Sequence, residues 1–142
     1  MHVELKICRN AVELLKRYSD EVAPVEAVAL LVGKASGLYG EVDAIYLVSN
    51  ERRSSSSFSV SPEDLAFVAR DIGERDIIGI FHSHPFWKAY PSSADMRYMW
   101  GYKFWLILGV DGLRCFTLLE EDIVEVNVKI EERQCDLIKV KK

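Results

Sequence analysis

Two histidines, His82 and His84, stand one residue apart at the end of an apolar run, and Asp95 follows them. The run, residues 77–81, is rich in β-branched and aromatic side chains and predicts a buried strand that continues into the histidines. Side chains of a strand alternate between its faces, so both imidazoles project from one face and can reach one ion. Pro85 lacks a backbone donor and ends the strand. The pattern therefore favours a metal site where a strand ends.

A catalytic zinc ion takes three protein ligands and keeps one position open for water. Asp95 is the nearest candidate for the third ligand, because it lies in the first turn of an expected helix that Ser92 or Ser93 would cap. His82, His84 and Asp95 would then hold one Zn²⁺. Structural alternatives exist: a buried histidine is commonly a hydrogen-bonded core residue, and Ser92-x-x-Asp95 also matches a helix capping box.

Apolar runs and helical stripes alternate along the chain, and they predict an α/β sandwich in which helices flank a mixed sheet. The last expected strand alternates cleanly and is predicted at a sheet edge, and Met96, Met99 and Trp100 of the last helix are expected to face the core. Expected helices, the first two capped by Asn10 and Ser61, cover residues 10–22, 61–73 and 92–101. Expected strands cover residues 3–8, 27–32, 42–48, 77–84, 103–110, 113–119 and 122–130, with a hairpin turn at Asp111-Gly112.

The length of 142 residues fits a single domain over residues 1–142 that can bury a core without metal or disulfide staples. A net charge of −4 without a dense basic cluster argues against nucleic acid as the main ligand. We find no signal-peptide pattern and no apolar run long enough to span a membrane, so we expect a cytoplasmic protein without membrane contact.

The cysteines Cys8, Cys115 and Cys135 are odd in number, widely spaced and lack a Cys-x-x-Cys pair. This argues against a disulfide framework and against a cysteine zinc site. Cys8 and Cys115 lie in strand-like runs, and we expect them to be small buried hydrophobic residues.

Two loops have open interpretations. Residues 49–61 contain four consecutive serines and predict either a mobile surface loop or a flap beside the active site. Phe86, Trp87 and Tyr90 cluster just after the histidines. They either pack on the protein itself or line a surface for a substrate or a second copy, which leaves a homodimer open.

The segment His82-Ser83-His84-Pro85, followed by Ser92-Ser93-Ala94-Asp95, resembles the metalloprotease motif of the JAMM (MPN+) family. Upstream, residues 24–33 are similar to the glutamate-bearing strand of that family, with Ala29 where a glycine is common. The resemblance spans roughly residues 5–119 and includes weaker matches at Asn50, Phe58 and Pro62. It implies a three-layer-like sandwich of a mixed, largely antiparallel curved sheet with flanking helices, of the cytidine-deaminase-like type.

The family's roles carry over to matching positions. His82, His84 and Asp95 would be the zinc ligands, Glu26 the general base and Ser92 the donor to the oxyanion, a division that suits metal-assisted amide hydrolysis. Glu26 taken alone reads as a solvated residue at the start of a strand. Ser83 points to the opposite face, where a hydrogen bond that supports the strand is its expected role.

The resemblance implies a zinc isopeptidase, deubiquitinase-like, of the minimal prokaryote type. Its substrate would be a ubiquitin-like or small modifier protein, or a conjugate of one, cut at the amide bond after the C-terminal Gly-Gly. One alternative is a processing peptidase that trims a sulfur-carrier protein for biosynthesis. A second is a non-catalytic MPN scaffold, although such relatives typically lack the metal-binding set that is present here.

Overall fold

A computed structural model describes residues 2–97 and 101–140 of the chain. Its helices are α1 (Arg9–Val22), α2 (Pro62–Asp71) and α3 (Ser93–Met96). Its strands are β1 (Glu4–Cys8), β2 (Val28–Ser36), β3 (Tyr39–Val48), β4 (Asp76–Ser83), β5 (Phe104–Gly109), β6 (Gly112–Leu119), β7 (Asp122–Glu131) and β8 (Asp136–Lys139). Most expected elements are therefore present within a few residues of their predicted bounds.

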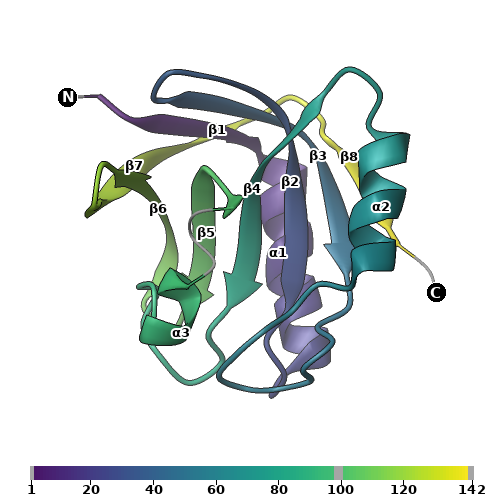
Figure 1. Cartoon of the computed structure of the whole chain (residues 1–142), viewed down its shortest axis with the longest axis vertical. Helices are drawn as coiled ribbons and strands as arrows, with labels where there is room; N and C mark the ends of the chain where they lie inside the picture. Colours follow the sequence, from purple (N-terminus) through teal and green to yellow (C-terminus); the bar gives the residue numbers. More distant parts are fainter. Residues whose placement is uncertain (1, 98–100, 141–142) are drawn as a thin grey trace.

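The strands form one sheet in the order β1-β7-β6-β5-β4-β2-β3-β8, and β1 pairs with β3 as well as with β7. The sheet therefore curves until β1 bridges two distant strands (Figure 1). Pairings β1–β7, β1–β3, β3–β8 and β4–β5 are parallel and the others antiparallel, which confirms the expected mixed, curved sheet. The edge position predicted for residues 122–130 is wrong, because β7 lies between β6 and β1.

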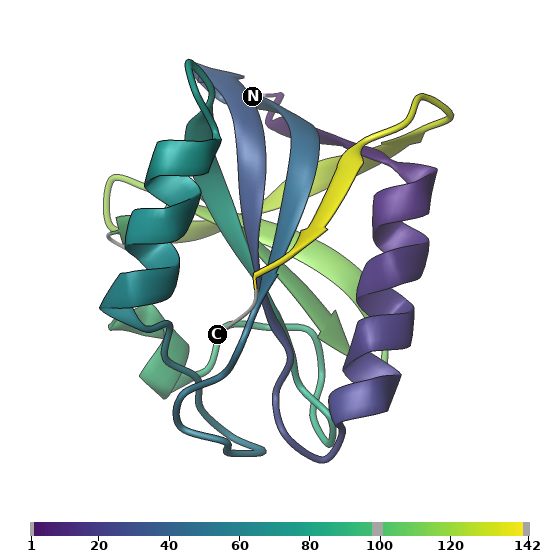
Figure 2. The same cartoon turned by 90° about the vertical axis from the view of Figure 1, so that its right-hand side faces the viewer.

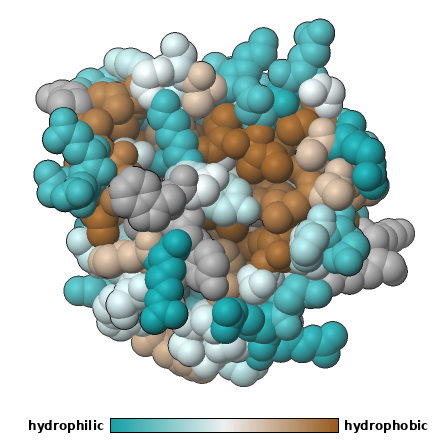
Figure 3. Space-filling model, viewed as in Figure 1, coloured by the Kyte–Doolittle hydropathy of each residue, from teal (hydrophilic) through white to brown (hydrophobic). Residues whose placement is uncertain are grey.

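Helices cover both faces of the sheet: α1 lies on one side, and α2 and α3 lie on the other (Figure 2). Buried Ala11, Val12 and Leu15 bring α1 into one core cluster, and buried Val68 brings α2 into the second. On the second face, apolar residues gather over β2, β3 and β4 beside α2 (Figure 3). None of the helices among the described residues has the length and apolar character needed to cross a membrane.

Cys8 and Cys135 form a disulfide, so the expectation that the cysteines stay unpaired is wrong for this pair. The cause is topological: β1 and β8 both run along β3, at Tyr39–Glu41 and Ala44–Leu47, and the two cysteines meet between these stretches. Cys115 is free and buried, as predicted.

One expected cap and one expected helix also need correction. Cys8, not Asn10, is at the N-cap of α1, and the Asn10 side chain instead bonds the backbone of Cys135 at 3.0 and 3.1 Å. Helix α3 is one turn long and ends at Met96, whose side chain is 40% exposed and does not face the core. Met99 and Trp100, which were expected to face the core, lie outside the described residues.

Candidate metal centre

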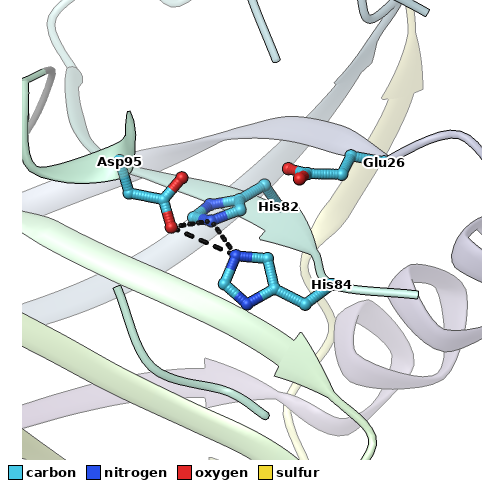
Figure 4. A group of neighbouring side chains, drawn as sticks. All are labelled: Glu26, His82, His84 and Asp95. Atoms are coloured by element: carbon cyan, nitrogen blue, oxygen red, sulfur yellow. Dashed lines mark hydrogen bonds and ion pairs between the residues drawn. The ribbon is translucent and has the colours of Figure 1, made fainter. Parts of the chain in front are cut away.

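Four side chains that are far apart in the sequence converge on one point: Glu26, His82, His84 and Asp95 (Figure 4). All four are buried, and one ligand atom from each lies within 4.8 Å of the others. His82 lies in β4, His84 follows the end of that strand, Asp95 lies on α3, and Glu26 precedes β2. The structure thus brings together the three predicted ligands and the predicted general base.

Three of the four groups form a nearly equilateral triangle. Asp95 Oδ2 lies 3.0 Å from His82 Nε2 and 3.1 Å from His84 Nε2, and the two Nε2 atoms are 3.1 Å apart. Ligand atoms bound to a tetrahedral zinc at about 2.0–2.1 Å lie about 3.3 Å from one another. A shift of a few tenths of an ångström would therefore fit these atoms around one ion, and imidazole with carboxylate is a donor set that suits zinc.

The His84 ring is oriented by a backbone hydrogen bond. Its Nδ1 donates to the carbonyl oxygen of Lys88 at 2.8 Å, which leaves the lone pair of Nε2 directed at the cluster. This is the tautomer that a metal-binding histidine needs. Nothing in the sequence indicated Lys88, because the group that acts is its main-chain carbonyl.

The His82 ring is held by packing instead. It stacks on Phe58, with ring centroids 4.7 Å apart, and meets the edge of Trp105 at 5.6 Å. Among the described residues, its Nδ1 has no hydrogen-bond partner. Phe58 was noted in the sequence through the family resemblance, but its contact with a metal ligand was not foreseen.

Burial raises the pKa of Glu26 to about 8; the nearby His84 opposes this rise, and the charge of Asp95 adds to it. Burial also opposes ionisation of Asp95, but hydrogen bonds with both histidines and with the Ser92 backbone hold its pKa well below the usual range. Burial lowers the pKa of His82; for His84 the Asp95 and Lys88 hydrogen bonds outweigh burial and raise the pKa. Asp95 is therefore the charged member, and Glu26 readily holds a proton.

The loop of residues 49–61 lies beside the site and fastens the backbone at Glu26. The Glu26 N–H donates to Ser54 O at 2.7 Å, and Asn50 Nδ2 donates to Glu26 O at 3.2 Å. Asn50 Nδ2 also donates to Ser57 O at 2.9 Å, which ties the loop to itself. The loop therefore lies against the backbone of Glu26, and its role as a flap stays a prediction.

Ser83 has the supporting role predicted for it. Its Oγ accepts a hydrogen bond from Ala27 N at 2.7 Å, and its N–H donates to Ala27 O at 3.0 Å. Ser83 thus fixes the residue next to Glu26 against the strand that carries His82. The Glu26 carboxylate, with Oε1 buried and unbonded among the described residues, turns toward the histidines (Figure 4).

Ser92 caps α3 in a complete capping box. Its Oγ accepts from Asp95 N at 3.1 Å, and its own N–H donates to Asp95 Oδ2 at 2.8 Å. The capping interpretation and the metal interpretation therefore apply together, because the cap aims the carboxylate of Asp95 at the histidines. The role of Ser92 at an oxyanion stays a prediction.

The aromatic residues after the histidines divide between the two interpretations. Tyr90 packs edge-on against Phe116 at 5.2 Å. Phe86 is 72% exposed and Trp87 44% exposed. Phe86 borders a hollow of about 390 Å³, which His84 also lines, between the end of α1 and the ends of β4 and β5.

Comparison with known proteins places this geometry in context. The family model of prokaryotic homologs of the JAB domain matches residues 9–119. Protein DSY2949 from Desulfitobacterium hafniense superposes with a TM-score of 0.80 at 23% identity, over 91% of this chain and 94% of that one. No match was found among curated proteins.

Two further solved structures are similar in fold. AF2198 from Archaeoglobus fulgidus, a JAB1/MPN domain protein, has a TM-score of 0.55 at 18% identity, over 89% of this chain and 99% of that one. A structure described as a JAMM, a metalloprotease-like zinc site in the proteasome and signalosome, has a TM-score of 0.53 at 16% identity, over 93% of this chain and 100% of that one.

Proposed function

This chain belongs to the prokaryotic JAMM/MPN family, and from that premise we propose that it is a zinc-dependent isopeptidase or peptidase. Family membership alone would also fit an MPN domain without catalysis. The observation that carries the proposal is the buried set of Glu26, His82, His84 and Asp95, in which three ligand atoms converge and a fourth group stands beside them. A scaffold has no need to bury four such groups together, because each is costly to desolvate.

His82, His84 and Asp95 would hold the ion, and Zn²⁺ bound there would act as a Lewis acid that polarises the scissile carbonyl and makes water more acidic. Asp95 supplies the negative charge of the ligand set, and the histidines supply neutral nitrogens. Glu26 accepts the proton of the attacking water and then delivers it to the leaving amine. Its carboxylate lies beside the ligand set, where a group that takes a proton in one step and releases it in the next must stand.

Ser92 is the proposed donor to the carbonyl oxygen as it becomes negative. Its Oγ already accepts from Asp95 N, so the hydroxyl's own proton remains to be donated. A donor fixed in advance toward developing charge lowers the barrier, because no reorganisation is needed during the reaction.

The proposed substrate is a ubiquitin-like or small modifier protein, cut at the amide after its C-terminal Gly-Gly. The hollow beside His84 supports a substrate with an extended tail, since it opens next to the ligand set and is bordered by Pro24, Phe86 and Val110. Val110 and Phe86 are exposed apolar residues at this rim. Such residues supply contact area to a bound chain.

Purified protein incubated with lysine-linked modifier conjugates and with linear fusions, with and without a chelator, tests the proposal. We expect cleavage after Gly-Gly that the chelator abolishes and added Zn²⁺ restores. Preference for linear fusions would instead favour a processing peptidase for a sulfur-carrier protein. Zinc-loaded protein that cleaves neither class would contradict the proposal.

Glu26→Gln separates catalysis from metal binding. We expect kcat to fall by about 10²–10⁴-fold, because the amide cannot take the proton, while the zinc content of the protein is unchanged. Glu21→Gln, at an exposed glutamate of α1, is the control and should retain full activity. Full activity in Glu26→Gln would remove Glu26 from the mechanism.

A further inference from the structure

One peptide group outside the ligand set is held from both sides. The carbonyl oxygen of Lys88 accepts the Nδ1–H of His84 at 2.8 Å. The N–H of Ala89, which belongs to the same peptide group, donates to Asp111 Oδ1 at 2.6 Å. A continuous chain of hydrogen bonds thus runs from the carboxylate of Asp111 through one amide to the imidazole of His84.

The strands around this peptide keep it in place. Val110 N donates to Trp87 O at 2.9 Å, and His84 N donates to Leu108 O at 2.8 Å, so the loop after β4 is pinned to the end of β5. A side chain at Gly109 would collide with the backbone of residues 87–89, so glycine is what lets the two segments approach so closely.

Asp111 is itself held as a carboxylate. The hydrogen bond from the Ala89 N–H lowers its pKa, with Arg114 nearby adding to the effect. Arg114 Nη1 lies 3.6 Å from Asp111 Oδ2, and Arg114 is bound by Glu125 at 2.7 and 3.1 Å. The Asp111-Gly112 pair, which the sequence marked only as a hairpin turn, therefore presents an oriented negative charge toward the loop that holds His84.

We propose that Asp111 is a positioning residue for the candidate metal centre and acts on His84 through the Lys88–Ala89 peptide. A metal-binding histidine commonly donates its second nitrogen to a carboxylate, which fixes the ring and makes it a stronger ligand. Here an amide stands between the two. The carboxylate of Asp111 accepts the hydrogen bond of the Ala89 N–H and polarises the peptide group, so the carbonyl oxygen of Lys88 becomes more negative. The hydrogen bond that this oxygen accepts from His84 therefore becomes stronger.

This inference rests on the proposed zinc site but makes a separate prediction about affinity. Asp111→Ala should bind Zn²⁺ about 10- to 100-fold more weakly in competition with a chromophoric chelator, the range typical of lost outer partners of metal ligands. Asp111→Asn keeps an acceptor oxygen without the charge and should lose less. Asp122→Ala, at an exposed aspartate that opens β7 in the next hairpin, is the matched control and should bind like wild type.

Co²⁺ substitution supplies a readout that a loss of fold stability would not produce. We expect the visible absorption of bound Co²⁺ to shift in both Asp111 variants and to stay unchanged in Asp122→Ala. Only the Asp111 variants change the hydrogen bonding of His84 and, with it, the strength of His84 as a ligand. Unchanged affinity and an unchanged Co²⁺ spectrum in Asp111→Ala would overturn the proposal. If Asp111→Ala does not fold, the same two results in Asp111→Asn would overturn it.

The outcomes also separate this inference from the proposed function. Wild-type protein that binds zinc but cleaves no conjugate or fusion overturns the hydrolase, while weaker binding by the Asp111 variants still supports the positioning role. Active wild type with unaffected Asp111 variants overturns the positioning role alone. Wild-type protein that binds neither Zn²⁺ nor Co²⁺ overturns both.

Discussion

His82 and His84 offer the same atom to the same point, yet two different regions of the molecule hold them. His82 lies inside the core on the α2 side, where its ring is held by Phe58 and Trp105 and its Nδ1 has no partner among the described residues. His84 lies at the mouth of the hollow, and its Nδ1 is bound to a main-chain carbonyl. One ligand is held by packing and the other by hydrogen bonding.

The difference assigns different functions to the two regions. A ring fixed by packing is part of the core, so its loss costs stability as well as metal. A ring fixed by a hydrogen bond depends on the polarity of its acceptor and can be tuned without disturbing the core. The pKa directions agree: burial lowers that of His82, and the bonds to Asp95 and Lys88 raise that of His84 despite burial.

The largest expected effect comes from removing either ring. His82→Ala and His84→Ala should each weaken zinc binding by about 10²–10³-fold, roughly one ligand's share of the 10–16 kcal/mol typical of a structural zinc site. In urea unfolding of the metal-free proteins, His82→Ala should also lose about 2 kcal/mol or more, because it leaves a cavity between two aromatic rings. His84→Ala should lose less than about 1 kcal/mol. If both variants lost the same free energy of unfolding, the distinction between a packed His82 and a hydrogen-bonded His84 would be wrong.

Phe58→Ala tests whether packing holds the His82 ring, and it leaves the candidate metal ligands intact. Phe58 is buried and contacts both His82 and Trp105, so its removal should lower the free energy of unfolding by about 3–5 kcal/mol. Zinc affinity, measured by chelator competition at a temperature where the variant is folded, should also fall, because the His82 ring loses its stacked partner. Phe58→Leu keeps much of the volume and should recover most of the stability. A stable Phe58→Ala with wild-type affinity would show that His82 does not depend on packing.

Local rules were enough to predict much of the site. The period of two in β4 put His82 and His84 on one face, and the cap at Ser92 put Asp95 in the first turn of a helix. These inferences succeed because each depends on residues only a few positions apart. Glu26 needed the family resemblance, since a glutamate before a strand has no distinctive local signal.

Most of the features that the sequence did not reveal depend on contacts between distant segments. The disulfide of Cys8 and Cys135 exists because β1 and β8 follow one another along β3, and neither the pairing nor β8 itself has a local signature. The edge position expected for β7 failed for the same reason, since β1 covers that edge. The carbonyl of Lys88 is a main-chain group, which side-chain patterns cannot mark.

Trp87→Ala should have the smallest effect, and it tests whether His84 is held by its hydrogen bond and not by packing. The centroid of the Trp87 ring lies 5.5 Å from that of the His84 ring, but Trp87 is 44% exposed. If the Lys88 carbonyl fixes His84, loss of this ring should leave zinc affinity within about 2-fold of wild type and cost about 0.5 kcal/mol of stability, as for other surface substitutions. Zinc affinity by chelator competition and the free energy of unfolding in urea should be measured for Trp87→Ala and Phe58→Ala side by side. A loss of zinc affinity as large as that of Phe58→Ala would mean that both histidines are held by packing, and the distinction between the two regions would fail.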